Sequence, residues 1–367
     1  MSDTVLIELR TEELPPKSLR VLGTVFAETV LAALKAQQFA GDDSVCTSYA
    51  TPRRLALTVT QVAERQPDRI LEKKGPAVSC GVDAAGQPSK ALEGFMRAAG
   101  VGFDQLHRRR DGNTEYFVAR WAKTGEELAA HLAEIVAQAL RKLPIAKLMR
   151  WGDSDHQFVR PVHGLILLHG RRIVPGSVLG LSSGRSTLGH RFLSSGDIVI
   201  DDAADYSARL LAGQVIASFD ERRATIAAQL AATAGRLGAQ IKAADELLDE
   251  VTALVEWPAV YVGRFEAEYL DVPQECLILT MQQNQKYFPL LDAGGKLLNS
   301  FLIVSNMAID DPANIISGNE RVVRPRLADA RFFYDQDRKN GFASRVVRLG
   351  AVIYHHQLGS LGDRAQR

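Results

Sequence analysis

Four groups of basic and aromatic residues in this chain have side chains suited to contacts with RNA. They are Arg53-Arg54 beside Tyr49; Lys73-Lys74; Arg160 with His190-Arg191-Phe192; and Arg321, Arg324, Arg326 and Arg331 near Phe332, Phe333 and Tyr334. Guanidinium groups bind phosphates as planar forks, and flat side chains stack on unpaired bases. His163 joins the candidates because, like His190, it has a glycine neighbour and an arginine within three residues. We predict that these residues contact RNA or a partner subunit, since arginine and aromatic residues are also enriched at protein interfaces.

Each group also has an ordinary structural interpretation. Arg53-Arg54 can flank the end of a strand, and Arg331 can pair with Asp335 one helical turn later. The aromatic residues can belong to a hydrophobic core. Residue type alone leaves these alternatives open.

The histidines and cysteines predict no metal site. His163 and His169 are six residues apart across an expected strand, and His355-His356 are adjacent, so neither pair has a chelating spacing. The three cysteines are far apart in the sequence, which indicates neither a disulfide framework nor a thiolate zinc site.

No catalytic or cofactor-binding residue is predicted either. The chain has no G-x-x-x-x-G-K-[ST] loop and no G-x-G-x-x-G after a strand. Gly180-Leu-Ser-Ser-Gly184 matches G-x-S-x-G, but a loop is expected after it, where a nucleophile elbow needs a helix. Adjacent acids such as Glu12-Glu13 diverge on a helix or a strand, so they do not form a catalytic dyad.

The candidates must be positioned by strands and helices that alternate along the chain. Strands are expected at Val5 to Leu9, Arg54 to Val62, Asn113 to Ala122, Leu165 to Leu168, Val215 to Phe219, Ala259 to Phe265, Lys286 to Leu291 and Leu297 to Val304. Helices are expected after Pro15-Pro16, after a capping box at Thr124 and Glu127, at Ala203 to Leu211, Asp220 to Leu237 and Asp245 to Val255, and from Pro325 onward. The pattern predicts a mixed α/β (α+β), multi-domain protein.

The length of the chain and a change in its residue pattern near residue 150 predict how the domains divide. The 367 residues suggest two or three domains at roughly 100 to 200 residues each. We expect an N-terminal α/β region at 1–150, a second α/β region at 151–325 with up to two subdomains, and a helical segment at 326–367.

The charge balance limits what kind of RNA contact is possible. Lys and Arg number 44 against 43 Asp and Glu, so the formal net charge is +1 and no global basic field exists. Any contact with RNA therefore needs local basic patches. The acidic start of the chain is unlike a signal peptide, and no apolar stretch is long enough to span a bilayer, so we expect a cytoplasmic protein with no membrane partner.

Several short sequences, in order along the whole chain, resemble the β subunit of bacterial two-subunit glycyl-tRNA synthetase. They include Thr11-Glu-Glu-Leu-Pro-Pro16, Tyr49-Ala-Thr-Pro-Arg-Arg-Leu55, Lys74-Gly-Pro-Ala77, Phe158-Val-Arg-Pro-Val-His-Gly164, Gly189-His-Arg-Phe192, Val255-Glu-Trp-Pro258, Gln285-Lys-Tyr-Phe288 and the block from Gly318 to Tyr334. Each is weak alone, whereas their common order is specific.

The resemblance implies an accessory subunit of a class II aminoacyl-tRNA synthetase. In that family the α subunit holds the catalytic core, with ATP and Mg, while the β subunit recognises tRNA(Gly) and completes an α2β2 assembly. The implied fold includes regions resembling parts of the phenylalanyl-tRNA synthetase β chain, followed by an HD-like domain. Family β subunits are longer, so we expect a piece truncated at the start of that domain, near Tyr354, and inactive alone.

Two other functions remain open from the sequence. A hydrolytic editing module would need a pocket of polar groups, which could form around His163, His190 and Arg191. A purely structural spacer for the α dimer would touch no RNA, and the near-neutral charge suits it.

Overall fold

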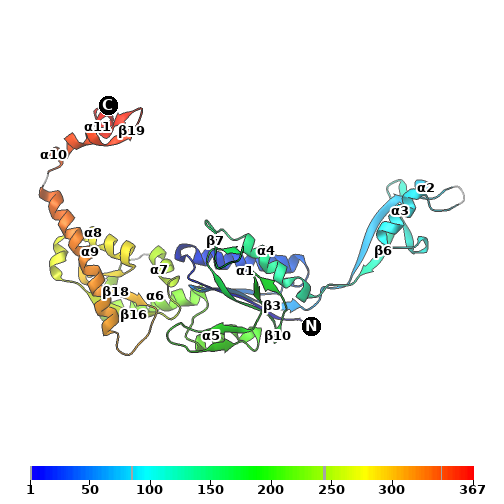
Figure 1. Cartoon of the computed structure of the whole chain (residues 1–367), viewed down its shortest axis with the longest axis horizontal. Helices are drawn as coiled ribbons and strands as arrows, with labels where there is room; N and C mark the ends of the chain where they lie inside the picture. Colours follow the sequence, from blue (N-terminus) through cyan, green and yellow to red (C-terminus); the bar gives the residue numbers. More distant parts are fainter. Residues whose placement is uncertain (1, 84–85, 243–244, 340) are drawn as a thin grey trace.

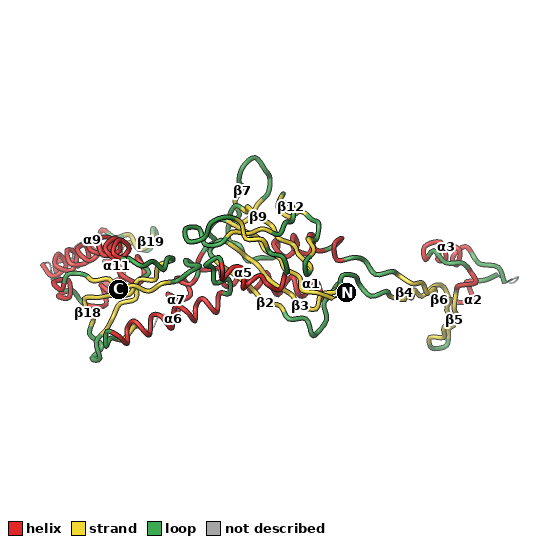
Figure 2. The backbone as a smooth tube through the Cα atoms, turned by 90° about the horizontal axis from the view of Figure 1, so that it is seen from below, coloured by secondary structure: helices red, strands yellow, loops and turns green. Residues whose placement is uncertain are grey.

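The fold is mixed α/β and consists of a central body with a projecting arm and a separate C-terminal segment (Figures 1 and 2). It is seen in a computed structural model that describes residues 2–83, 86–242, 245–339 and 341–367. The predicted fold class is confirmed. Among these residues, no helix combines the length and apolar content needed to cross a bilayer.

Five antiparallel strands form the central sheet, in the order β10-β9-β1-β3-β2. Their bounds are Ser2–Thr11 (β1), Cys46–Thr51 (β2), Arg54–Ala63 (β3), Val162–His169 (β9) and Arg172–Ile173 (β10). At the centre, Ile7 lies between Leu57 and Leu167. The strands predicted around these three residues are confirmed.

Both faces of the central sheet are buried, because apolar residues continue without alternation through β1, β3 and β9. On one face, Leu165 and Leu167 share a core with α1 (Leu19–Ala36) and α4 (Leu132–Arg141). On the other, Ile166 and Leu168 pack with α5 (Tyr206–Ala212). Figure 1 shows α1 and α4 on one side of the sheet and α5 on the other.

The pairing of β1 with β9 joins segments on either side of the expected domain boundary near residue 150. Eight consecutive residues of β9, Val162–His169, belong to the same sheet as the N-terminal strand. The helix before residue 150 and the strand after it also share one core. Nothing local in the sequence marks this contact, because strand pairing joins residues that are distant along the chain.

The arm is a three-stranded antiparallel sheet inserted between β3 and α4, in the order β4-β6-β5. Its strands are Arg69–Ala77 (β4), Leu106–Asp111 (β5) and Thr114–Lys123 (β6), and its helices are Val78–Gly81 (α2) and Lys90–Ala99 (α3). The strand predicted at Asn113 to Ala122 is confirmed. Figures 1 and 2 show that the arm extends away from the body and is joined to it by two connecting stretches of chain.

A second, four-stranded sheet forms the other half of the body, in the order β15-β17-β18-β16. Its elements are Phe219–Arg236 (α6), Gln240–Ile241 (β15), Asp245–Thr252 (α7), Ala259–Arg264 (β16), Gln274–Leu279 (α8), Phe288–Leu291 (β17), Leu297–Ser305 (β18) and Ala313–Lys339 (α9). Leu302 packs toward α6 and α7, and Phe301 packs toward α8 and α9. The predicted hairpin around Asp292 to Gly295 is confirmed.

The prediction that Pro325 is the first residue of a helix is wrong, because Pro325 lies inside helix α9. The helix begins at Ala313 and passes through Pro325 without ending. Proline removes one backbone hydrogen bond, but Val323 and Leu327 on either side are fully buried against the sheet, and this packing keeps the helix continuous. The expected domain edge after residue 325 therefore falls inside one helix.

Two other local predictions were wrong because the backbone finds different partners. Residues 124–127 form no capping box, because the chain there pairs with Gln66, whose amide donates to the Glu126 carbonyl at 3.0 Å. Only a short 3-10 helix, Leu128–Ala130, follows directly, and α4 starts at Leu132. Residues 215–218 form no strand, because the carbonyls of Ile216 and Ala217 accept hydrogen bonds from the guanidinium of Arg222.

Small hairpins and the C-terminal segment complete the described fold. The hairpin strands are Met149–Arg150 (β7), Gln157–Phe158 (β8), Ser177–Val178 (β11), Leu181–Ser182 (β12), Ser186–Leu188 (β13) and Asp197–Val199 (β14). The C-terminal segment holds Phe342–Val346 (α10), Ile353–His355 (β19), Gly359–Ser360 (β20) and Leu361–Gln366 (α11), and it lies beyond the end of α9 (Figure 1).

Candidate functional site

One cavity of about 320 Å³ brings together residues from five separate segments of the chain. It lies where the end of β1, the turn between β2 and β3, the start of β9, the loop between β13 and β14, and the residues before β16 meet. Of the residues predicted from the sequence, Arg53, Arg54, His163, His190 and Arg191 line it. Arg160 lies outside the lining and donates to the Glu13 carbonyl at 2.9 Å.

The wall of the cavity is anchored by a buried ionic network centred on Arg54. Its guanidinium lies 2.7 Å from the carboxylate of Glu256 and 3.6 Å from that of Glu8. It also donates to the Leu188 carbonyl at 2.6 Å, while the Tyr206 hydroxyl donates to Glu8 at 2.5 Å. All four side chains in this network are less than 6% exposed, so one cation is shared by two carboxylates that are out of contact with water.

The environment shifts the pKa values of this network in directions that keep it ionic. Burial, the largest influence, would lower the pKa of Arg54, but the charges of Glu256 and Glu8 together raise it above its ordinary value. Burial and the charge of Glu8 raise the pKa of the Tyr206 phenol well above 10.0. Tyr206 therefore remains a hydrogen-bond donor, and Arg54 a cation, at any physiological pH.

A second buried arginine, Arg222, ties this network to the other half of the body. It is completely buried and donates to backbone carbonyls only, including Ala50 at 2.7 Å and Thr252 at 3.0 Å. Burial lowers its pKa to about 10, because no carboxylate lies in direct contact to offset the desolvation. Its position on α6, bonding to the end of β2, holds the two sheets of the body together.

His190 fixes the loop that forms one side of the cavity. Its Nδ1 accepts hydrogen bonds from the backbone amides of Phe192 and Leu193, at 3.3 and 3.2 Å. The ring is 1% exposed, and its Nε2 is buried with no hydrogen-bond partner among the described residues. A buried polar atom of this kind is rare in native proteins and marks a place where a ligand or water completes the structure.

The mouth of the cavity carries exposed ion pairs. His163 lies 3.0 Å from Glu12, and Arg53 lies 2.6 Å from Glu13. Arg53 and Arg54 are neighbours in the sequence, but their side chains have different environments: that of Arg53 is 23% exposed and that of Arg54 is 2% exposed.

Lys73 and Lys74 lie on β4 of the arm, which extends away from the body (Figure 1). Lys74 pairs with Asp111 at 2.7 Å and lies over the ring of Tyr116, with 3.7 Å between its Nζ and the ring centroid. Lys73, on the opposite side of the strand, is exposed and forms no ion pair with any described residue. The two neighbouring lysines are therefore not equivalent.

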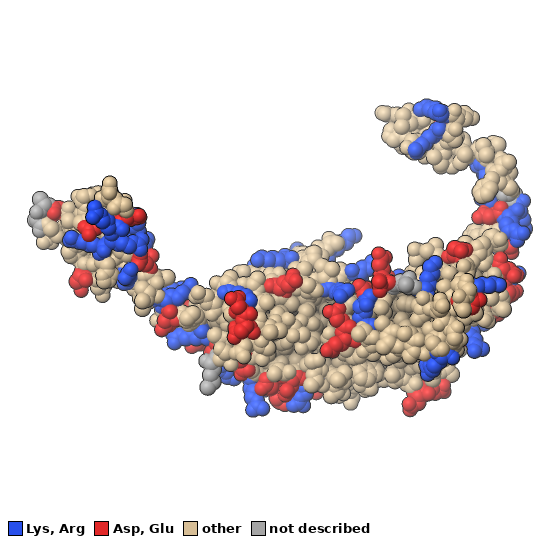
Figure 3. All heavy atoms as spheres, turned by 180° about the vertical axis from the view of Figure 1, so that it is seen from behind, with Lys and Arg blue, Asp and Glu red and all other residues tan. Residues whose placement is uncertain are grey.

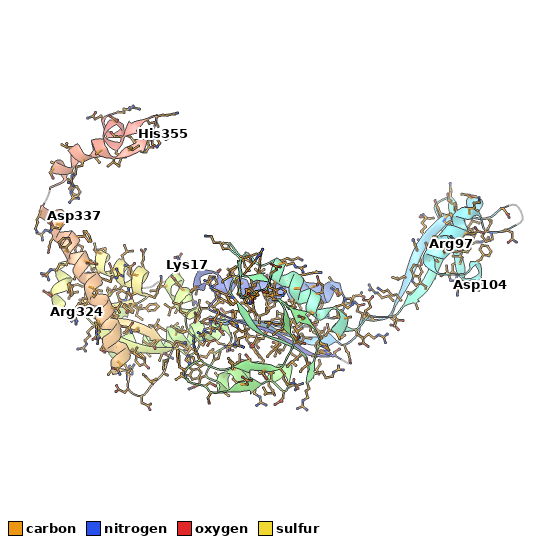
Figure 4. The ribbon with its side chains drawn as sticks, in the orientation of Figure 1. Lys17, Arg97, Asp104, Arg324, Asp337 and His355 are labelled. Carbon is orange, nitrogen blue, oxygen red and sulfur yellow. The ribbon has the colours of Figure 1, made fainter. Side chains whose placement is uncertain are left out.

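The four candidates on α9 form a third location. Arg324 pairs with Glu266 at 2.6 Å and Arg331 with Glu268 at 2.8 Å, so both bind the helix to the segment before α8. Arg331 also lies 4.0 Å from Asp335, as the ordinary interpretation expected. Arg321 and Arg326 instead line an open groove on the helix surface. Figure 4 shows Arg324 on α9 and His355 on the separate C-terminal segment.

The acids and the tyrosine of the buried network, Glu8, Glu256 and Tyr206, were not predicted as site residues from the sequence. Glu8 lies within the apolar run Leu6-Ile-Glu-Leu9, and a lone carboxylate in a buried strand signals a buried partner. Arg10, which donates to the His163 carbonyl at 3.3 Å, and Arg222 had no comparable signal. In the described part of the chain, no three histidine, cysteine or acidic residues are grouped so as to hold a metal ion.

Comparison with known proteins identifies the family. The family model for the glycyl-tRNA synthetase beta subunit matches residues 5–367. The chain is 53% identical to the glycine--tRNA ligase beta subunit of Neisseria gonorrhoeae over 367 residues, which cover 100% of this chain and 53% of that protein. For the subunits of Aromatoleum aromaticum and Pectobacterium atrosepticum the identities are 53% and 47%, each over 99% of this chain and 53% of the relative.

The chain spans about half the length of these curated relatives. The resemblance inferred from the ordered motifs is confirmed by a match that includes nearly every residue. The chain belongs to the glycyl-tRNA synthetase beta subunit family.

Proposed function

We propose that this chain recognises tRNA and helps to assemble a glycine--tRNA ligase, without supplying catalytic residues. In this proposal the α subunit attaches glycine to tRNA(Gly), holds the class II core and binds ATP and Mg, and the complex is an α2β2 tetramer in the cytoplasm. The family membership supports a role in the ligase. The charge distribution of the arm is the observation that supports contact with RNA.

The arm concentrates positive charge in a chain that is otherwise slightly acidic. Residues 69–123 contain ten Lys and Arg against six Asp and Glu, a net charge of +4, so the rest of the chain has a net charge of −3. Figure 3 shows Lys and Arg gathered on the arm. A local basic surface of this kind attracts phosphates, although the whole chain is nearly neutral.

The register of the arm separates paired from unpaired basic residues. Glu72 pairs with Arg109 and Arg120, and Lys74 with Asp111, on one face of the sheet. Because side chains alternate along a strand, Lys73, Arg108 and Arg110 lie on the opposite face. Within the described ranges, none of these three forms an ion pair, so their charges are available for phosphates.

The projecting position of the arm suits an extended ligand. It reaches away from the body, and its far end carries α3, on which Arg97 is exposed (Figure 4). A surface held at a distance from the body can contact a tRNA whose other parts lie on a different subunit.

Binding of tRNA(Gly) to a variant of the chain tests this proposal. The triple variant Lys73→Ala/Arg108→Ala/Arg110→Ala should weaken binding and lower the dependence of log Kd on log salt. Each lost phosphate contact lowers that slope by roughly 0.7 to 0.9. Three lost contacts should therefore reduce it by about 2 to 3.

A matched triple variant on the body separates local contact from net charge. Arg141, Arg209 and Arg236 are exposed on α4, α5 and α6, and their replacement by alanine changes the charge equally. This variant should bind tRNA(Gly) with an unchanged slope. Equal losses in both variants would contradict an RNA contact on the arm. No binding by the unaltered chain would favour a structural spacer.

A further inference from the structure

We propose that the cavity bounded by Arg10, Arg54, His190 and Arg191 is a binding site for a phosphate group. The phosphate can belong to a free nucleotide or to the end of an RNA strand. This inference does not depend on the proposed function, because it uses different residues from those of the arm.

The Nε2–H group of His190 is the first donor. Two backbone amides donate to Nδ1, so that nitrogen is the acceptor of the neutral imidazole and the hydrogen is on Nε2. This N–H is buried in the wall of the cavity with no partner in the described structure. Burying an unpaired donor is unfavourable, and an oxygen of a bound ligand would offset that cost.

The charges of the lining indicate that the ligand is an anion. Four arginines and two glutamates contribute to it. Glu256 pairs with Arg54, whose charge Glu8 also shares, and Glu12 lies 3.0 Å from His163. The four arginines and two glutamates of the lining give a formal charge of +2. Arg10 and Arg191 form no ion pair with any described residue, and Arg191 instead lies over the ring of Phe192, 5.7 Å from its centroid. Two guanidinium groups therefore remain for a ligand.

The arrangement favours phosphate over a carboxylate. The three donor groups come from two walls: Arg10 from β1, and His190 and Arg191 from the loop after β13. Guanidinium forks bind phosphate through paired hydrogen bonds, and a tetrahedral group can accept from several directions at once. The cavity also has the volume for more than a phosphate, since about 320 Å³ lies at the low end of small-ligand sites.

Buried contacts hold the walls around the site. Arg54 and Glu256 hold one wall through a buried ion pair, and the hydrogen bonds from two backbone amides to His190 hold the loop. A preformed site loses less free energy in ordering on binding than a flexible one.

Calorimetric titration of the chain tests the proposal. The probes are inorganic phosphate, AMP, a short single-stranded RNA with and without a 5′-phosphate, and acetate, all at matched ionic strength. Arg191→Gln and Arg10→Gln should each weaken phosphate binding by about 10- to 100-fold, the value of one charge-assisted contact. Arg171→Gln is the matched control, because Arg171 is 81% exposed and outside the cavity.

Each outcome has a definite meaning. Binding of phosphate and AMP with this variant pattern supports a free phosphate ligand, and binding of only the 5′-phosphorylated RNA, with the same pattern, supports a strand end. The proposal is overturned if acetate binds as well as phosphate, or if no probe binds up to millimolar concentration. Binding that both cavity variants leave unchanged, or RNA binding that ignores the 5′-phosphate, also overturns it. Arg191 is exposed, so its variant tests the site without disturbing the core.

Discussion

Replacing Arg54 by methionine should destabilise the body far more than the same change at its neighbour Arg53. Methionine retains the length of the side chain but removes the cation that Glu8 and Glu256 share. Those carboxylates are 1% and 4% exposed, so they would remain buried without a counter-charge. Breaking a buried ion pair by removing one partner costs about 3–5 kcal/mol.

The geometry of the network supports this magnitude. Two charges about 4 Å apart interact by about 4 kcal/mol at an effective dielectric constant of about 20. Arg54 lies within that distance of both acids. By contrast, Arg53 pairs with Glu13, whose side chain is 65% exposed, and such a surface pair contributes only about 0–1 kcal/mol.

Urea denaturation followed by tryptophan fluorescence, to which Trp257 next to Glu256 contributes, measures the difference. With a slope of about 2–3 kcal/mol per molar, the Arg54→Met midpoint should fall by about 1–2 M, and the Arg53→Met midpoint by less than about 0.5 M. Adding Glu256→Gln to Arg54→Met should restore part of the loss, because one uncompensated charge is removed. Equal midpoints for the two arginine variants would refute the reasoning.

Three further outcomes follow from individual contacts. Tyr206→Phe should cost about 1–3 kcal/mol in the same urea assay, because Glu8 loses a buried donor; a loss below about 0.5 kcal/mol would contradict this. Burial raises the pKa of the Cys46 thiol to about 11 from its usual 9.0, which lowers the thiolate fraction at pH 8 about 100-fold. Iodoacetamide should therefore label Cys46 much more slowly than the exposed Cys80 and Cys276. Equal labelling rates in mass spectrometry would contradict this expectation. Gly125→Ala should speed tryptic cleavage at the base of the arm, because an added Cβ would lie 1.8 Å from the Gln66 carbonyl oxygen, whereas Gly94→Ala, with open space around it on α3, should stabilise the arm by about 0.5–1 kcal/mol and not speed cleavage.

Local pattern predicted many of the elements, because the strongest signals come from burial. The run Leu165-Ile-Leu-Leu168 predicted a strand buried on both faces, and β9 has that environment. The predictions failed where a distant partner competes with local preference. Residues 215–218 have the apolar content of a strand, but the guanidinium of Arg222 donates hydrogen bonds to the carbonyls of Ile216 and Ala217. No pattern within the segment predicts these bonds.

The candidate site was predictable in residue type but not in role. The sequence did not distinguish Arg53 from Arg54, and only the fold shows that Arg53 is partly exposed and Arg54 is buried. His163 and His190 were chosen from their neighbours, and both line the cavity. Their meeting depends on the pairing of β1 with β9, a contact between segments about 150 residues apart that local periodicity does not encode.

The most direct test of the proposed function is a pair of titrations of this chain, one with tRNA(Gly) and one with the isolated α subunit, each at several salt concentrations. We expect the chain to bind both. Its affinity for tRNA(Gly) should fall steeply with salt, by roughly 0.9 log units for each phosphate contact per log unit of salt. Binding to the α subunit alone, with no measurable affinity for tRNA(Gly) at low salt, would contradict it.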